Sequence, residues 1–153
     1  MRRGLNRRVA RGTYALLIQL TTGCRLIVGK LGPREFPEGY YLYLGSALNG
    51  LEGRLRHHLQ RDKKPRWHID VLTNVEAVAQ IWWSEGDDRR EWLWAWAALA
   101  HPGASTPVPG FGSSDCRCIT HLVHFSIRSQ VHSLLQLIAP DSCRRYTDLA
   151  DWQ

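Results

Sequence analysis

A tyrosine, an arginine and a histidine lie close together in this sequence, with a spacing that suits phosphate chemistry. Residues 40–43 alternate aromatic and apolar side chains as a strand does, and a Gly-Ser pair ends the strand. Leucines at helical spacing over residues 48–59 predict a helix next. Arg54 and His58 are four residues apart on that helix, so their side chains are neighbours. A fixed cation and a titratable imidazole therefore follow a strand that carries Tyr43. The alternative is an ordinary strand–turn–helix whose Arg and His are solvated.

A second tripeptide upstream gives this stretch a family resemblance. Gly12-Thr13-Tyr14 opens an apolar run, and together with Tyr43-Leu44-Gly45 it resembles the GIY-YIG nuclease superfamily. The stretches 67–70 (WHID) and 110–116 (GFGSSDC) are similar to a little-characterised branch of it, whose members occur alone or fused to endonuclease III-type DNA glycosylases. The resemblance implies an α+β fold, with a small central antiparallel β-sheet flanked by helices. It also implies a metal-dependent endonuclease that hydrolyses phosphodiester bonds in DNA, in repair or processing.

The resemblance also implies which residues carry the chemistry. Its motif tyrosines correspond to Tyr14 and Tyr43, and its essential helix arginine to Arg54. Arg54 would bind the scissile phosphate, whose oxygens a guanidinium matches in bidentate fashion. Tyr14 would accept a proton from the attacking water, which requires its pKa to be lowered from about 10. Tyr43 would orient that water or the phosphate, while His58 and His68 would relay protons.

Glu91 is the candidate metal ligand and the sixth catalytic residue. It opens a predicted Trp-rich helix and resembles the metal-binding glutamate of the family. Few protein ligands and several waters suit Mg²⁺ or Mn²⁺. A carboxylate at a helix start is also common without any metal. Glu85, Asp87 and Asp88 are rival ligands, unless they are solubilising charges in a turn.

The sequence departs from the family pattern at three places. Thr13 stands where Ile is usual, an exchange expected not to matter. Gly50 looks inserted before the helix and is expected to shift Arg54. No asparagine follows the glutamate helix within residues 102–115. Ser114 or Asp115 is the candidate to replace it.

Charge is unevenly distributed along the chain, and this favours a polyanionic partner. Residues 1–68 hold fourteen Lys and Arg against four Asp and Glu, whereas residues 69–153 hold six against ten. Neutralised phosphates release counterions, so a basic face favours DNA. A solvated basic surface is the alternative. The predicted nucleic-acid-binding residues are Lys30, Ser46, Arg56, Arg61, Lys63, Lys64 and Arg66.

Cysteine and histidine near the end of the long loop raise the question of zinc. Cys116, Cys118, His121 and His124 form a Cys-x-Cys-x-x-His-x-x-His pattern. Cys-x-Cys lacks the usual gap of a zinc site, and a single strand cannot easily surround a tetrahedral metal. Buried free thiols are therefore preferred to structural zinc. His57 is expected to face solvent.

The predicted elements make one domain. Residues 13–21 and 24–30 are expected to form a hairpin, 31–38 a loop, and 40–45 a strand. Helices are predicted at 51–60, 68–74, 89–100 and 129–138, with strands at 76–83 and 119–125. Trp92, Trp96 and Leu99 are expected to form the core stripe of the third helix.

A basic flexible arm (1–11), a nuclease-like domain (12–125) and a C-terminal helical extension packed on it (126–153) complete the predicted organisation. No apolar run reaches the roughly 20 residues of a membrane span, and the expected location is the cytoplasm. Two other classes stay open: a catalytically inactive nucleic-acid-binding domain on the same fold, and a zinc-stabilised interaction module.

Overall fold

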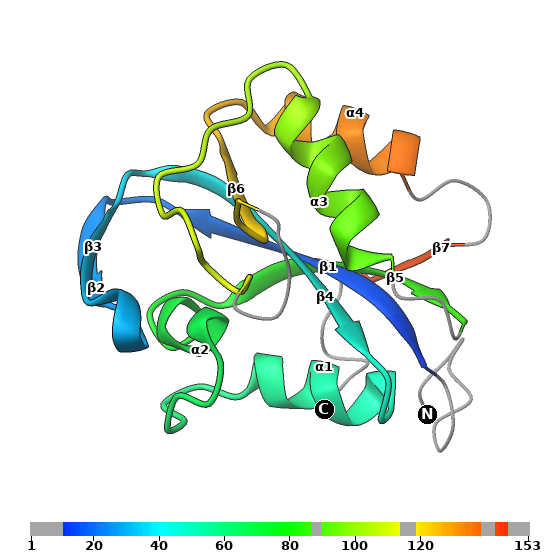
Figure 1. Ribbon diagram of the computed structural model, residues 1–153, viewed down its shortest axis with the longest axis horizontal. Coiled ribbons are helices and arrows are strands. Elements are labelled where there is room, and N and C mark those ends of the chain that lie inside the picture. Colours follow the sequence, from blue (N-terminus) through cyan, green and yellow to red (C-terminus); the bar gives the residue numbers. More distant parts are fainter. Residues whose placement is uncertain (1–10, 87–89, 114–118, 139–142, 147–153) are drawn as a thin grey trace.

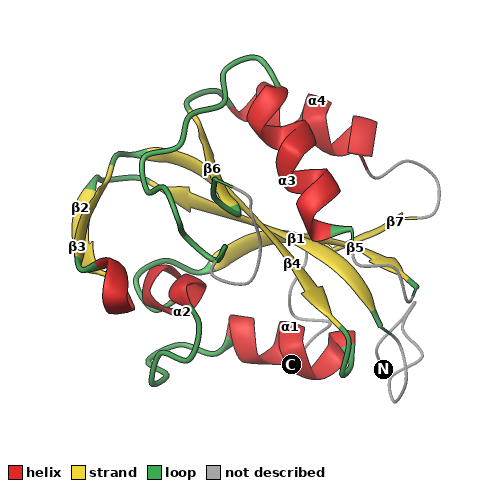
Figure 2. Cartoon of the chain, in the orientation of Figure 1, coloured by secondary structure: helices red, strands yellow, loops and turns green. Residues whose placement is uncertain are grey.

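One antiparallel sheet runs through the middle of the molecule, with helices on both faces (Figures 1 and 2). The computed structural model describes residues 11–86, 90–113, 119–138 and 143–146. The strands lie in the order β6-β4-β1-β5-β7. Their bounds are β1 Gly12–Leu20, β4 Gly39–Ala47, β5 Val78–Glu85, β6 Leu122–Phe125 and β7 Cys143–Tyr146. The predicted α+β fold with a central antiparallel sheet is confirmed.

The central strand, β1, is buried on both faces and divides the core in two. It pairs antiparallel with β4 on one side and β5 on the other. Tyr14 and Leu16 belong to one apolar cluster, whereas Ala15 and Leu17 belong to the other. This is the period of two expected of a strand between two layers.

Two helices cover each face. Helices α1 (Leu51–Leu59) and α2 (His68–Thr73) pack on the side of Tyr14, while α3 (Glu91–Ala100) and α4 (Arg128–Ile138) pack on the opposite side (Figure 1). All four predicted helices are confirmed, with ends within a few residues of the predicted ones. No helix among the described residues is long and apolar enough to cross a membrane.

The predicted hairpin between residues 13–21 and 24–30 is wrong. β2 (Cys24–Ile27) pairs instead with β3 (Pro33–Phe36) in a separate two-stranded sheet, joined by the short 3₁₀ helix η1 (Gly29–Leu31). β3 therefore lies where a loop was expected. β1 is buried almost throughout, whereas β2 alternates half-buried and exposed residues. A half-exposed strand suits an edge ribbon, and Pro33 is tolerated as the first residue of β3.

The predicted core stripe of α3 is wrong for its two tryptophans, although Leu99 does pack against the core. Trp92 and Trp96 are exposed, whereas Trp94, Ala95 and Ala98 pack into the core. Apolar residues occur all round this helix, so the hydrophobic period does not select a face. Small residues at positions 95 and 98 allow α3 to lie close to the sheet, and this orientation buries Glu91.

The last described strand, β7, was not predicted from the sequence. It adds to the edge of the sheet beyond β5. β6 is shorter than the strand predicted at 119–125 and pairs with β4 at the opposite edge. In α1, Leu51 and Leu55 are buried, whereas Leu48 before the helix is exposed.

Candidate functional site

A cavity of about 360 Å³ opens between the end of β4, the helix α1 and the start of α3. It is lined by Tyr43, Leu44, Gly45, Ser46, Leu48, Asn49, Arg54, Arg66, Trp67, His68, Glu91, Gly112 and His121. Four of the six predicted catalytic residues thus share one cavity although they come from four separate elements. The other two, Tyr14 and His58, are buried and do not line it.

Two glycines leave the space that the side chains of Tyr14 and Tyr43 occupy. A Cβ on Gly45 would sit 2.5 Å from Cζ and Oη of Tyr14, and a Cβ on Gly112 would sit 2.9 Å from Cε1 of Tyr43. The φ of Gly112 is +69°, a region that other residues rarely adopt. The Gly of the second tripeptide is therefore required by the phenol of the first. The tyrosine ring centroids lie 6.4 Å apart.

Tyr14 and His58 form a buried hydrogen-bonded pair. Oη of Tyr14 lies 2.7 Å from Nε2 of His58. Burial raises the pKa of Tyr14 to about 12, although charge and hydrogen bonding from Arg54 act in the opposite direction. Burial also lowers the pKa of His58 to about 3. The lowered pKa that a proton-accepting Tyr14 requires is therefore not found in this state, because desolvation outweighs Arg54. Burial likewise raises the pKa of Tyr43 well above its ordinary value.

Arg54 is held at the cavity wall by a carbonyl and an aromatic ring. Nη1 donates to the backbone oxygen of Ser46 at 3.1 Å. The guanidinium carbon also lies 4.3 Å from the ring centroid of Trp67, and that of Arg66 lies 4.7 Å from the same ring. One indole therefore orders two cations beside the cavity. Gly50 takes the N-cap of α1 with φ +122°, and with it in place Arg54 still lines the cavity.

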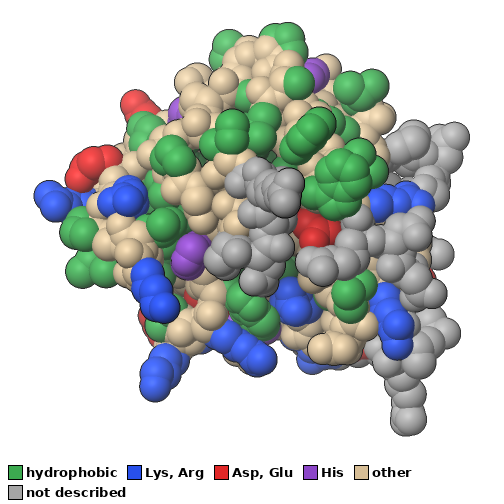
Figure 3. Space-filling view, viewed as in Figure 1, with side chains coloured by type: hydrophobic (Ala, Val, Ile, Leu, Met, Phe, Trp, Pro, Cys, Tyr) green, Lys and Arg blue, Asp and Glu red, His purple; other side chains and the backbone are tan. Residues whose placement is uncertain are grey.

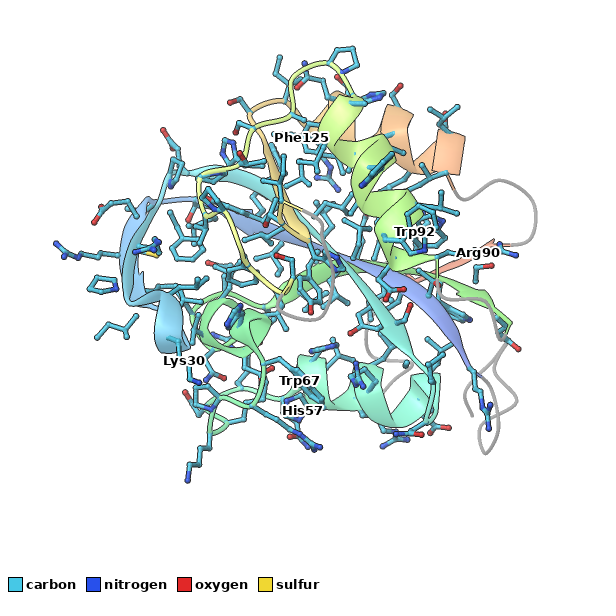
Figure 4. All side chains as sticks on the ribbon, viewed as in Figure 1. Lys30, His57, Trp67, Arg90, Trp92 and Phe125 are labelled. Carbon is cyan, nitrogen blue, oxygen red and sulfur yellow. The ribbon has the colours of Figure 1, made fainter. Side chains whose placement is uncertain are left out.

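Glu91 is tied to both signature strands. Ser46 Oγ donates to Glu91 Oε2 and lies 3.4 Å from Thr13 Oγ1. Thr13 Oγ1 in turn accepts from the backbone N–H of Arg90 at 3.0 Å, at the start of α3 (Arg90 and Trp92 are labelled in Figure 4). The hydroxyl of Thr13 satisfies a donor at the helix start that Ile, the usual residue of the family pattern, could not.

The donor set fits a hard divalent cation with few protein ligands. Glu91 is 6% exposed and is the only Asp or Glu among the described residues that line the cavity. No group of three or more His, Cys, Asp or Glu able to hold a metal occurs among the described residues. Mg²⁺ commonly binds through one or two carboxylates together with waters and substrate phosphates. Glu91 is thus suited to Mg²⁺ or Mn²⁺ rather than to zinc. Its rival Glu85 is exposed, while Asp87 and Asp88 lie outside the described residues.

The remaining histidines at the cavity are bound to backbone groups. His68 Nδ1 accepts from the N–H of Gly112 at 2.9 Å, and burial lowers the pKa of His68. A proton relayed by His68 would therefore have to pass through Nε2. His121 Nδ1 lies 3.1 Å from the carbonyl of Leu44. His121 had no predicted role, yet it lines the cavity because it joins the long loop to β4.

Asp70 is the polar residue that sequence reasoning missed. It is fully buried, and Oδ2 accepts from the backbone N–H of Arg66 and Trp67 and from Nε2 of His57. Burial would raise the pKa of Asp70, but these hydrogen bonds hold it below its ordinary value. His57 therefore binds Asp70 rather than facing solvent as predicted. The WHID stretch was the available signal, since an acid at the third position of a helix caps it.

The predicted nucleic-acid-binding residues lie in different settings. Ser46 and Arg66 line the cavity, while Lys30, Arg61 and Lys64 are exposed outside it. Arg56 pairs with Glu52 one turn away at 3.0 Å. Lys63 Nζ donates to the carbonyl of Gln60 and to Thr73 Oγ1, and burial lowers its pKa. Lys63 therefore holds the loop between α1 and α2. Figure 3 shows Lys and Arg side chains spread along the lower half of the drawn face.

His124, one of the four residues of the possible zinc pattern, uses both ring nitrogens in other hydrogen bonds. His124 Nε2 donates to the carbonyl of Glu38 at 2.8 Å, and its Nδ1 lies 3.0 Å from Ser105 Oγ. Both ring nitrogens are thus occupied. Cys116, Cys118, Ser114 and Asp115 lie outside the described residues, as do residues 1–10. Cys24 is a half-buried free thiol.

One family profile, described as domain of unknown function DUF123, matches residues 13–142. The chain belongs to the DUF123 family. This family is GIY-YIG-like. The match covers Thr13 and Tyr14 of the first tripeptide, the whole of the second, the Arg54 helix and Glu91. No curated protein and no solved structure matches the chain.

Proposed function

We propose that this DUF123 protein is a divalent-metal-dependent endonuclease that hydrolyses phosphodiester bonds in DNA. One observation carries the proposal: Tyr43, Arg54 and Glu91, from β4, α1 and α3, line the same cavity. Phosphodiester hydrolysis needs an activated water, a base, positive charge for the pentavalent transition state and a proton for the leaving oxygen. A tyrosine, a guanidinium and a carboxylate in one cavity can supply the first three with a bound metal.

Arg54 binds the scissile phosphate through its guanidinium. At rest it uses one Nη1 hydrogen bond to Ser46 and contacts the Trp67 ring. A planar guanidinium carries five N–H donors, so others can meet two phosphate oxygens. The Trp67 ring limits the rotamers open to the side chain, which reduces the entropy lost when phosphate binds.

Tyr43 and Tyr14 have different roles toward the attacking water. Tyr43 lines the cavity and orients the attacking water or the phosphate. Tyr14 packs behind Gly45 and is bonded to His58, so it can accept the water proton when it has passed its own to that imidazole. A phenol with a pKa near 12 does not ionise at neutral pH, and the imidazole beside it has a pKa of about 3. The proton therefore has to pass to His58 as the water attacks phosphorus, not before.

Glu91 would hold Mg²⁺ or Mn²⁺ in this cavity. When bound, such an ion supplies positive charge to a non-bridging or leaving oxygen of the phosphate. Ser46 orients the carboxylate, and Thr13 links Ser46 to the start of α3. Two strands and a helix therefore fix one carboxylate.

A cleavage assay on labelled oligonucleotides tests the proposal. Wild-type protein should cut single- or double-stranded DNA with Mg²⁺ or Mn²⁺ present and not with chelator. Glu91→Gln, which keeps the shape of the side chain, should lose metal-dependent cleavage and retain DNA affinity. Binding without cleavage by the wild type would reject the nuclease and leave a nucleic-acid-binding domain.

A further inference from the structure

Two buried polar atoms face one another behind the cavity without a hydrogen bond. Nδ1 of His58 and Oδ1 of Asp70 lie 3.9 Å apart, and neither has a hydrogen-bond partner among the described residues. His58 is 1% exposed and Asp70 is fully buried. An orphaned buried polar atom is costly, so two that face each other point to an interaction made at another stage.

The hydrogen bonds around His58 and Asp70 determine which ring nitrogen of His58 carries the proton. Oδ2 of Asp70 is already engaged by His57 and by two backbone N–H groups. On the far side of the imidazole, Nε2 is bonded to Oη of Tyr14. If the ring proton were on Nε2, a lone pair of Nδ1 would face a carboxylate oxygen. With the proton on Nδ1, that N–H points at Asp70, and Nε2 accepts from Tyr14.

We propose that Asp70 is a positioning residue that holds His58 as its Nδ1–H tautomer, so that Nε2 can accept the Tyr14 proton, and that its negative charge stabilises the imidazolium. The role of Asp70 in turnover rests on the proposed function. In this step the O–H bond of Tyr14 breaks and an N–H bond forms at Nε2. The tyrosinate takes a proton from the attacking water, whose oxygen bonds phosphorus as the leaving P–O bond breaks. The imidazolium then releases its proton and the leaving oxygen takes one up, so no proton or electron is gained overall.

The charges around His58 show why an acid is needed there. Burial lowers the pKa of His58, and Asp70 is the group that raises it. Arg54 and His57 on the same helix and Lys63 on the following loop all lower it. The phenols of Tyr14 and Tyr43 also face the ring. Asp70 therefore opposes three basic groups as well as desolvation.

The tautomer of His58 can be measured in the wild-type protein by ¹⁵N–¹H NMR, with no substrate present. We expect a protonated Nδ1 and an unprotonated Nε2. In Asp70→Asn the amide oxygen can still accept from the backbone N–H groups of Arg66 and Trp67 while its NH₂ faces His58, which should move the ring proton to Nε2. His57→Gln is the matched control and should leave the tautomer of His58 unchanged. An Nε2–H tautomer in the wild type would overturn the proposal, as would the same tautomer in wild type and Asp70→Asn.

The pH dependence of the cleavage rate is a second measurement, and a purely structural role of Asp70 would not change it. Asp70→Asn should lower the single-turnover rate about 10²-fold or more at pH 7, because the wrong tautomer cannot accept the proton. The loss should shrink as pH rises toward the pKa of Tyr14, where the phenol ionises without help. An equal loss at every pH, or a rate within a few-fold of wild type, would overturn the role. The expected tautomers without cleavage of any DNA by the wild type would support the positioning of His58 and reject the nuclease.

Discussion

Arg54 brings a permanent positive charge into a cavity beside two tyrosines whose pKa is raised by burial. Burial also keeps the imidazole of His58 neutral at physiological pH. The site therefore combines the two guanidinium groups of Arg54 and Arg66 with tyrosine and histidine side chains that are uncharged at rest. Two consequences of this arrangement can be measured on single residues.

Arg54→Ala should lower the cleavage rate about 10²-fold or more, the usual cost of removing one preorganised transition-state donor. DNA affinity should change little, because basic residues elsewhere supply most phosphate contacts. Arg56→Ala removes the same charge from the same helix, where it pairs with Glu52, and should affect binding rather than rate. Single-turnover kinetics and titrations on one oligonucleotide separate the two. A rate for Arg54→Ala close to that of Arg56→Ala would remove Arg54 from the mechanism.

The neutral state of His58 should make the protein acid-sensitive. Its pKa is about 3 when folded against 6.5 ordinarily, so the unfolded chain binds the proton first as pH falls. This contribution to the free energy of unfolding is present above pH 6.5 and is lost progressively toward pH 3, at about 1.4 kcal/mol per unit. Denaturant titrations between these pH values should show a steeper loss for the wild type than for His58→Gln. Parallel curves would show that His58 does not titrate in this way.

At the scale of elements, the signature glycines set how closely strands and side chains approach. A Cβ on Gly12 would lie 2.0 Å from the carbonyl oxygen of Ser84 on β5, and one on Gly45 would meet the Tyr14 phenol. Gly45→Ala and Gly12→Ala should each cost about 1–3 kcal/mol of stability, as overpacking does. Gly53→Ala in α1, where nothing lies within 4 Å, should instead stabilise by about 0.5–1 kcal/mol. Thermal or denaturant unfolding would show the difference, and similar changes for all three would contradict the packing described.

Elements with strong local signals were predictable from the sequence, whereas their partners were not. Strand β4 and helix α1 carry clear alternation, turn residues and leucine spacing. The pairing of β2 with β3 depends on which strands are buried on both faces. The orientation of α3 depends on close packing of Ala95 and Ala98. Both are decided by tertiary contacts that no local pattern records.

The site residues that belong to a known family motif were predictable from the sequence, whereas the others were not. Tyr43, Arg54 and Glu91 were placed together by the family resemblance, and they share the cavity. Asp70 was missed because its sequence signal is that of a helix cap. The raised pKa of Tyr14 was missed because burial of a strand residue beneath a helix is a property of the whole fold.

At the scale of the whole molecule, the basic first half of the sequence should give DNA binding a strong salt dependence. The logarithm of the affinity should fall with that of the salt concentration, with a slope near −0.9 per phosphate contact on duplex and about −0.7 on single strands. Deleting residues 1–10 should flatten the slope without changing the rate at saturating DNA. Lys64→Ala should also flatten it, while Lys63→Ala should lower stability, because Lys63 holds its loop. A slope near zero would reject nucleic acid as the partner.

Metal binding at Glu91 can be tested by a crystal structure of the protein with manganese, measured at the manganese absorption edge. We expect an anomalous peak in the cavity lined by Tyr43 and Arg54, with the Glu91 carboxylate as its protein ligand. The peak should be absent from Glu91→Gln crystals soaked in the same way. Manganese bound at Glu85 or Asp115 with none at Glu91, or a peak that persists in Glu91→Gln, would show that Glu91 is not the metal ligand.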